Sequence, residues 1–216
     1  MSKLIIIGAG GHCRAVIAIL RDNGWKDPEA IFDVVATSTT KKSGEIIMGL
    51  PVFNIIKDLE NLVSNRDYSV LLAIGDNSTR EDWFNRAKGL GCMLPNLIST
   101  MAVVNSTAEL GEGVIVCPQA FIGPEVIIGD NVLINTSAIV EHESQIGSHS
   151  HVSPGSVIAG RVTLGESVMI GSNATVISNI CISDHTVVGA GGVVIKNITD
   201  AGSTWVGVPV RKVNVK

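Results

Sequence analysis

The sequence predicts a two-part fold: a small Rossmann-like α/β domain over residues 1–95, then an all-β parallel β-helix with a C-terminal tail over residues 96–216. Two patterns carry this prediction. An aliphatic residue recurs at every sixth position of the second part, and the first part opens with a strand, a glycine-rich turn and a helical segment. Composition agrees, because Gly, Val and Ile are abundant whereas aromatic residues make up only 4% of the chain.

The six-residue repeat runs without a break from Ile98 to Val194. Its aliphatic members are Ile98, Val104, Leu110, Val116, Ile122, Ile128, Ile134, Val140, Ile146, Val152, Ile158, Leu164, Ile170, Val176, Ile182, Val188 and Val194. The residue after each is usually small or polar, and we interpret it as the point where the backbone turns. Three units close one triangular coil, and successive coils pair their strands about 4.8 Å apart.

The first 95 residues alternate apolar strands with helical segments, which predicts a parallel sheet. We expect strands at residues 4–7, 30–35 and 69–74, helices at 12–23, 58–63 and 78–90, and a mobile loop at 36–50. Gly24 should end the first helix, and Asn77 or Ser78 should cap the last.

Charge and cysteine content narrow the function. The net charge is −4 and no basic run exists, which argues against nucleic acid or an anionic membrane as a partner. No apolar segment is long enough for a signal peptide or a membrane span. The four cysteines (Cys13, Cys92, Cys117 and Cys181) lie far apart, which is typical of reduced thiols. We therefore expect a cytoplasmic protein.

A glycine-rich turn, Gly8-Ala9-Gly10-Gly11-His12, stands between the first strand and the first helix. Glycines there let the backbone approach a phosphate, and the helix N-terminus favours an anion. A full dinucleotide motif needs glycine where this chain has Cys13. The turn thus predicts a site for a nucleotide or nucleotide-sugar diphosphate, and a tight turn that binds nothing is the alternative.

Two further polar positions end strands of the same predicted sheet. Gly75, followed by Asp76 and Asn77, comes after the third strand, at the edge where ligands bind in open α/β sheets. Asp33 ends the second strand and is a candidate for contact with a base or ribose.

Polar residues gather in the repeat between Asn135 and His151. Histidine is the usual general base near neutral pH, and a carboxylate from Glu143 or Glu141 would orient His142. The cluster of His142, His149 and His151 also raises a zinc site between subunits, as in γ-type carbonic anhydrases. That alternative predicts a zinc-dependent lyase.

The whole chain resembles the bacterial sugar O- and N-acetyltransferases of the sialic-acid acetyltransferase and bacillosamine-pathway group. The segments that carry the resemblance are GAGGH (8–12), AIGDNSTR (73–80), INTSAIVEHE (134–143), SHVSPGSVIAG (150–160) and WVGVPVRKV (205–213). The hexapeptide repeat alone is shared by many enzymes. Its combination with an N-terminal α/β domain is much more specific.

The resemblance implies a left-handed β-helix, acetyl-CoA as co-substrate without a metal, and a homotrimer with active sites between subunits. It implies catalytic roles for His142 as base, Glu143 as the acid that raises its basicity, and Asn135. Acetyl-CoA would contact His151, Gly160, Ser172 and Ala190. The nucleotide-sugar would contact Gly10, Gly11, His12, Asp33 and Gly75, although Val34 stands after Asp33 where the family has a second acid.

These expectations combine into one reaction: direct acetyl transfer from acetyl-CoA to the amine of a nucleotide-linked 4-amino-4,6-dideoxy sugar, with UDP as the nucleotide. O-acetylation of sialic acid or a related glycan unit is the alternative within the class. The zinc lyase and a catalytically silent scaffold are the alternatives outside it.

Overall fold

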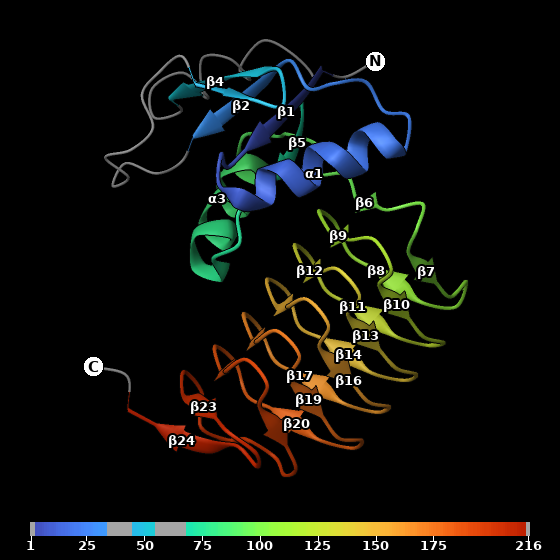
Figure 1. Ribbon diagram of the computed structural model, residues 1–216, viewed down its shortest axis with the longest axis vertical. Helices are drawn as coiled ribbons and strands as arrows, with labels where there is room; N and C mark the ends of the chain where they lie inside the picture. Colours follow the sequence, from blue (N-terminus) through green and yellow to red (C-terminus); the bar gives the residue numbers. More distant parts are fainter. Residues whose placement is uncertain (1–2, 34–44, 55–67, 215–216) are drawn as a thin grey trace. The chain divides into compact units, whose positions relative to one another are not determined.

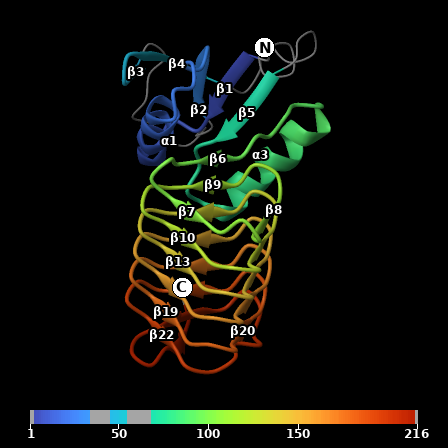
Figure 2. The same ribbon diagram turned by 90° about the vertical axis from the view of Figure 1, so that its right-hand side faces the viewer.

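A computed structural model describes residues 3–33, 45–54 and 68–214. The chain divides into two compact units, Met1–Leu97 and Ile98–Lys216. Figures 1 and 2 show the helices and sheet of the first unit and the stacked coils of the second. Among the described residues, no helix is both long and apolar enough to cross a membrane.

The described part of the first unit is built on a sheet in the order β3-β4-β2-β1-β5. Its strands are β1 (Lys3–Ile7), β2 (Ala30–Asp33), β3 (Ile46–Ile47), β4 (Leu50–Asn54) and β5 (Tyr68–Leu72). β1 pairs in parallel with β2 and β5, which confirms the expected parallel arrangement. The carboxyl ends of these three strands therefore share one edge, the edge at which open α/β sheets bind ligands.

Helix α1 (Gly11–Asp22) follows β1 directly. Its buried residues Cys13, Val16, Ile17 and Leu20 follow the three-to-four-residue spacing of a helix face. The helix ends at the predicted place, because Gly24 adopts a φ of 73° and donates its N–H to the Arg21 carbonyl at 2.9 Å.

Helix α3 (Asn77–Gly89) begins one residue before the predicted range, and its predicted cap is wrong. The N-cap is Asp76, whose Oδ1 accepts the Thr79 N–H at 2.8 Å and the Thr79 hydroxyl at 2.7 Å. Ser78 donates its hydroxyl to the same oxygen. A carboxylate accepts all three bonds at once, and its charge suits the positive end of the helix dipole.

The loop expected at residues 36–50 is wrong at its C-terminal end. β3 and β4 form an antiparallel hairpin there, and β4 also pairs in parallel with β2. Met48 and Gly49 connect them with φ angles of 50° and 87°, the positive values that a two-residue hairpin turn requires. Residues 34–44 and the helix expected at 58–63 lie outside the described residues.

The second unit is a parallel β-helix, as predicted, with three sheets running along it (Figure 2). The β6 sheet holds β6 (Leu97–Ile98), β9 (Ile115–Val116), β12 (Leu133–Ile134), β15 (His151–Val152), β18 (Met169–Ile170), β21 (Val187–Val188), β23 (Thr204–Val206) and β24 (Arg211–Val213). The β7 sheet holds β7 (Val103–Val104), β10 (Phe121–Ile122), β13 (Ile139–Val140), β16 (Val157–Ile158), β19 (Thr175–Val176) and β22 (Val193–Val194). The β8 sheet holds β8 (Glu109–Leu110), β11 (Ile127–Ile128), β14 (Gln145–Ile146), β17 (Thr163–Leu164) and β20 (Cys181–Ile182).

Each strand pairs with the strand 18 residues further on, so Leu133 lies beside His151 and Ile139 beside Val157. The aliphatic residues of the repeat stack inside this coil and form its core, and from Val116 onward they are almost fully buried. The six-residue pattern is therefore the record of one inward position per strand.

The corners turn differently from the sequence interpretation. The left-handed backbone conformation falls three residues after the aliphatic residue, for example at Glu143 and Arg161 with φ of 58° and 60°. The glycine next to the aliphatic residue serves close packing between coils instead. A Cβ on Gly171 would lie 2.5 Å from the Ala190 backbone nitrogen, and one on Gly123 would lie 2.9 Å from that of His142.

Candidate active site

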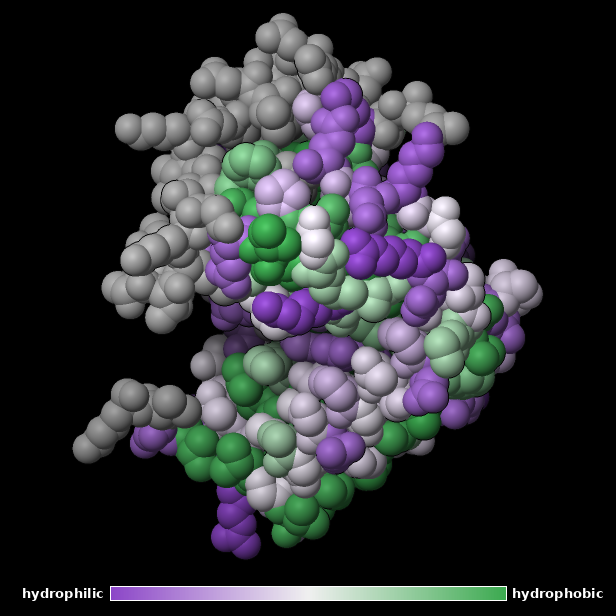
Figure 3. All heavy atoms as spheres, turned by 45° about the horizontal axis from the view of Figure 1, so that its top comes forward, coloured by the Kyte–Doolittle hydropathy of each residue, from purple (hydrophilic) through white to green (hydrophobic). Residues whose placement is uncertain are grey.

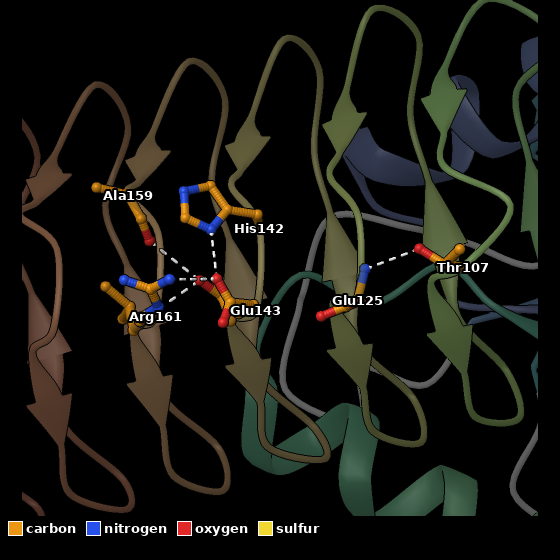
Figure 4. A network of polar contacts seen from close by, with 8 residues as sticks. Thr107, Glu125, His142, Glu143, Ala159 and Arg161 are labelled. Atoms are coloured by element: carbon orange, nitrogen blue, oxygen red, sulfur yellow. Dashed lines mark hydrogen bonds and ion pairs between the residues drawn. The ribbon is translucent and has the colours of Figure 1, made fainter.

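His142 and Glu143 lie on the corner between the β7 and β8 sheets, as Figure 4 shows. His142 Nδ1 lies 2.9 Å from Glu143 Oε2, so the carboxylate predicted to orient the base does contact it. With Nδ1 bonded to the carboxylate, Nε2 is the nitrogen left to accept a proton from a substrate. The imidazole is 49% exposed, which leaves it accessible in this chain.

Gly160 lies one coil further along the same corner, directly under the His142 ring. A Cβ built on Gly160 would meet three atoms of that ring, with Cε1 and Nε2 at 2.6 Å and Cδ2 at 3.2 Å. The glycine is therefore required by the position of the imidazole. Its own N–H is not needed for the coil, because the same position one coil earlier is Pro124, which has no N–H.

Arg161 is a site residue that the sequence interpretation missed. Its guanidinium lies 2.9 Å from Glu143 Oε2, the oxygen that also contacts His142 (Figure 4). Arg161 and then His142 hold the pKa of the Glu143 carboxyl below its usual value, chiefly through hydrogen bonds to the ionised form. The signal in the sequence was the coil length, because Arg161 lies 18 residues after Glu143.

Asn135 and His151 form a second group, on the corner between the β6 and β7 sheets and on β15. Asn135 Oδ1 accepts the Thr136 N–H at 2.8 Å, which leaves Nδ2 to donate to His151 Nε2 at 3.1 Å. His151 is only 7% exposed in this chain. Ser172 and Ala190 lie on the same corner as Asn135, one coil apart. Within one chain these residues and the His142 group occupy different corners of the coil.

The glycine-rich turn lines a cavity of about 340 Å³ in the α/β unit. Its walls include Gly10, Gly11, His12 and Gly75, the four predicted ligand residues of the two strand ends. Asp33, buried at the end of β2, is not among the residues that line it. A larger hollow of about 640 Å³ lies at the opposite ends of β1 and β5, beside Lys3 and Ser69, away from the edge that binds ligands in this class of sheet.

A buried cation lies under this cavity. Arg80 is 2% exposed and donates to the carbonyls of Ile74 and Gly75 at 3.2 and 3.3 Å. Burial and, to a smaller extent, the charge of Arg80 lower the pKa of His12 to about 4. His12 Nε2 is buried and has no hydrogen-bond partner among the described residues. The cavity thus presents a neutral imidazole beside an array of glycine backbone.

The three histidines raised as zinc ligands contact different partners. His142 contacts Glu143, His149 Nδ1 lies 2.8 Å from Asn131 Nδ2, and His151 contacts Asn135. Among residues 3–33, 45–54 and 68–214, no three His, Cys, Asp or Glu side chains form a group that could hold a metal ion.

Comparisons with known families agree with both units. The sequence profile of the PglD N-terminal domain matches residues 3–87, and that of the bacterial transferase hexapeptide (six repeats) matches residues 125–160. A comparison with curated proteins gave no match.

Solved structures match along the whole chain. PerB from Caulobacter crescentus, solved with CoA and GDP-perosamine, is 35% identical, with a TM-score of 0.89 over 99% of this chain and 98% of that one. The acetyltransferase domain of PglB from Neisseria gonorrhoeae, solved with acetyl coenzyme A, is 28% identical, with a TM-score of 0.85 over 98% of each chain. WeeI from Acinetobacter baumannii, at 24% identity and a TM-score of 0.84, shares the fold over 99% of this chain and 100% of that one.

The likeness to PerB covers both units, and it confirms the resemblance and the fold class predicted from the sequence. The chain belongs to the left-handed β-helix family of hexapeptide-repeat acyltransferases that carry a PglD-type N-terminal domain.

Proposed function

We propose that this protein transfers an acetyl group from acetyl-CoA to the amine of a nucleotide-linked 4-amino-4,6-dideoxy sugar, with His142 as general base. The observation that carries the proposal is the His142–Glu143 contact at 2.9 Å, on a corner of a β-helix whose family members bind CoA. A sugar amine as acceptor is supported by PerB, which was solved with GDP-perosamine and CoA.

The reaction is a direct transfer. The amine nitrogen attacks the thioester carbonyl carbon while His142 Nε2 takes the amine proton, and the C–N bond forms. The C–S bond then breaks, and the CoA sulfur leaves as a thiol after His142 returns the proton. The Gly160 N–H, which the coil does not use, is our candidate donor to the oxyanion of the tetrahedral intermediate.

The cysteines support a transfer without a covalent acetyl-enzyme. Cys13 and Cys117 are fully buried, and burial raises the pKa of the Cys117 thiol to about 12. A thiol with such a pKa is not a nucleophile near neutral pH. Glu143, by contrast, is ionised and contacts His142, which suits a base that shuttles one proton.

We assign the diphosphate of the nucleotide-sugar to the 340 Å³ cavity of the α/β unit. Gly10 and Gly11 open helix α1, whose N-terminus favours an anion, and a Cβ on Gly10, Gly11 or Gly75 would meet nothing within 4 Å. This open glycine backbone allows a phosphate to approach closely. His12 and Asp33 remain proposed contacts of the sugar-nucleotide.

We further propose a homotrimer in which adjacent subunits complete each active site. Within one chain, His142 and the group of Asn135, His151, Ser172 and Ala190 lie on different corners, so a neighbouring copy would bring the two groups together. Hydrophobic side chains also remain exposed on the β-helix, as the green surface in Figure 3 shows for one face. A sedimentation measurement that gives a monomer at assay concentrations would contradict this arrangement.

The acceptor is tested by following thiol release from acetyl-CoA against a panel of UDP-, GDP-, dTDP- and CMP-linked amino sugars, with GDP-perosamine included. We expect release with at least one 4-amino sugar, together with a product heavier by one acetyl group. Matched sugars with a hydroxyl in place of the amine, and sialic acid, test O-acetylation. Release with these acceptors alone would overturn the amine assignment.

A further inference from the structure

Arg161 occupies a backbone position that an arginine adopts at a cost. Its φ of 60° lies in the left-handed region, where a non-glycine side chain costs about 1 kcal/mol or more and where asparagine is tolerated best. The equivalent position one coil later is Asn179, with a φ of 63°. Nothing in the turn itself requires a long cationic side chain at residue 161.

The corner that carries Arg161 is fixed to the corner that carries His142. The Arg161 N–H donates to the His142 carbonyl at 2.9 Å. Ser144, fully buried, donates its hydroxyl to the Ala159 carbonyl at 3.0 Å and accepts the Val162 N–H at 3.2 Å. These bonds hold the backbone on both sides of Gly160 and Arg161, so the guanidinium starts from a defined place.

Arg161 and His142 share one oxygen of the same carboxylate. Glu143 Oε2 lies 2.9 Å from the Arg161 guanidinium and 2.9 Å from His142 Nδ1. Exposed ion pairs contribute little to stability, and the Arg161 side chain is 60% exposed. The contact therefore matters for where the carboxylate points and for how much of its charge reaches the imidazole.

We propose that Arg161 is a positioning residue for the reaction proposed above: it holds Glu143 against His142 Nδ1 and limits the negative charge that Glu143 offers to the imidazolium. The proposal rests on the assignment of His142 as the base. An unopposed carboxylate would stabilise the protonated ring and keep the base occupied at neutral pH. Arg161 counteracts this stabilisation and also repels a proton on His142 directly.

Other charges on this corner stay constant in the test. Glu125 lies one coil before Glu143 at the same corner position, and Glu141 lies two residues before it. With His142 and Arg161, they are the ionisable side chains of the described residues on the corner segments of these three adjacent coils. Neither glutamate is changed in the variants, so their contribution to His142 cancels between proteins.

The test compares Arg161→Asn, which suits the left-handed backbone, with Arg161→Lys, which keeps the charge, and with Lys196→Asn as a control for net charge. In Arg161→Asn we expect the acid limb of kcat/KM to move up by about 0.5 to 1 pH unit. We expect kcat to fall about tenfold through misplacement of the base, with KM for acetyl-CoA unchanged. Arg161→Lys should return the acid limb toward wild type, and Lys196→Asn should change nothing.

Two outcomes would overturn the inference. One is a raised KM for acetyl-CoA or sugar with an unchanged pH profile, which would make Arg161 a substrate ligand. The other is an equal shift when Arg161→Asn is placed in a Glu143→Gln background, since the effect must pass through Glu143.

An activity-independent readout separates this inference from the proposed function. Titration of the His142 Cε1–H signal by NMR, assigned by its loss in His142→Ala, should show the same upward shift in Arg161→Asn. If that shift appears but no amino sugar is acetylated, the proposed function fails while the coupling stands. If acetylation occurs and the signal does not move, the inference about Arg161 fails alone.

Discussion

Gly160 offers the sharpest perturbation of the base, because a single methyl group at this position acts directly on the imidazole. The backbone of Gly160 lies outside the left-handed region, so Gly160→Ala introduces no backbone strain. The new Cβ would lie 2.6 Å from His142 Nε2 and Cε1, whereas ordinary contacts begin at 3.4 Å. The ring must therefore retreat by about 0.8 Å or rotate.

The size of that displacement sets the expected loss of activity. A misplacement of about 1 Å at a catalytic group costs on the order of 100-fold in rate, so kcat for acetyl transfer should fall by about that factor. Stability should change little, because the half-exposed ring can swing toward solvent. Steady-state thiol release measures the rate, and thermal unfolding followed by circular dichroism measures the fold.

A double-mutant cycle tests the cause. The three atoms nearest to the new Cβ all belong to His142, so in a His142→Ala background Gly160→Ala should fit without a clash and leave the residual rate unchanged. A further large loss of rate in that background would refute the clash and would favour a direct role of the glycine backbone. Unchanged activity of the single variant would refute the placement of the ring.

Three further predictions concern stability. Asp76→Ala removes the α3 cap and should cost about 1 kcal/mol in urea denaturation; the pKa of Asp76 is lowered by the Thr79 hydroxyl and N–H, so the contribution is present at neutral pH and lost as pH falls below about 4. His12 has a pKa lowered to about 4, so the unfolded chain takes up its proton first, and stability should fall by up to about 3 kcal/mol as pH drops from 6.5 to 4. His12→Gln should flatten that slope, and an unchanged slope would contradict the burial of a neutral ring. Ser144→Val replaces the buried hydroxyl with the side chain found one coil away at Val126 and should cost about 1 to 2 kcal/mol, because the Ala159 carbonyl and Val162 N–H lose their partner.

Local patterns in the sequence were sufficient for the fold and for the centre of the site. The unbroken aliphatic series predicted the β-helix because each strand has one inward position. The adjacent pair His142 and Glu143 was predictable because the two side chains meet within one corner. Gly10, Gly11, His12 and Gly75 line one cavity because the strands that precede them end at the same edge of the sheet.

Contacts between coils were harder to predict. Arg161 and Ser144 act on residues one coil away, and this relation becomes visible only when the 18-residue coil is laid out. The role of Gly160 was mistaken for a turn feature for the same reason, since what demands glycine is the ring of His142 above it. The hairpin at β3 and β4 was missed because its strands are short and its turn pairs Met48, not asparagine, with Gly49.

The most direct test of the proposed base is the rate of His142→Ala with the acceptor that the panel identifies, measured as N-acetylated product by mass spectrometry. His185→Asn is the matched control, because His185 is an exposed histidine of the same β-helix at a position with a φ of 56° that asparagine tolerates. We predict a loss of about 100- to 10,000-fold for His142→Ala and wild-type activity for His185→Asn. A His142→Ala protein that keeps its fold and oligomeric state and still turns over near the wild-type rate would contradict the account.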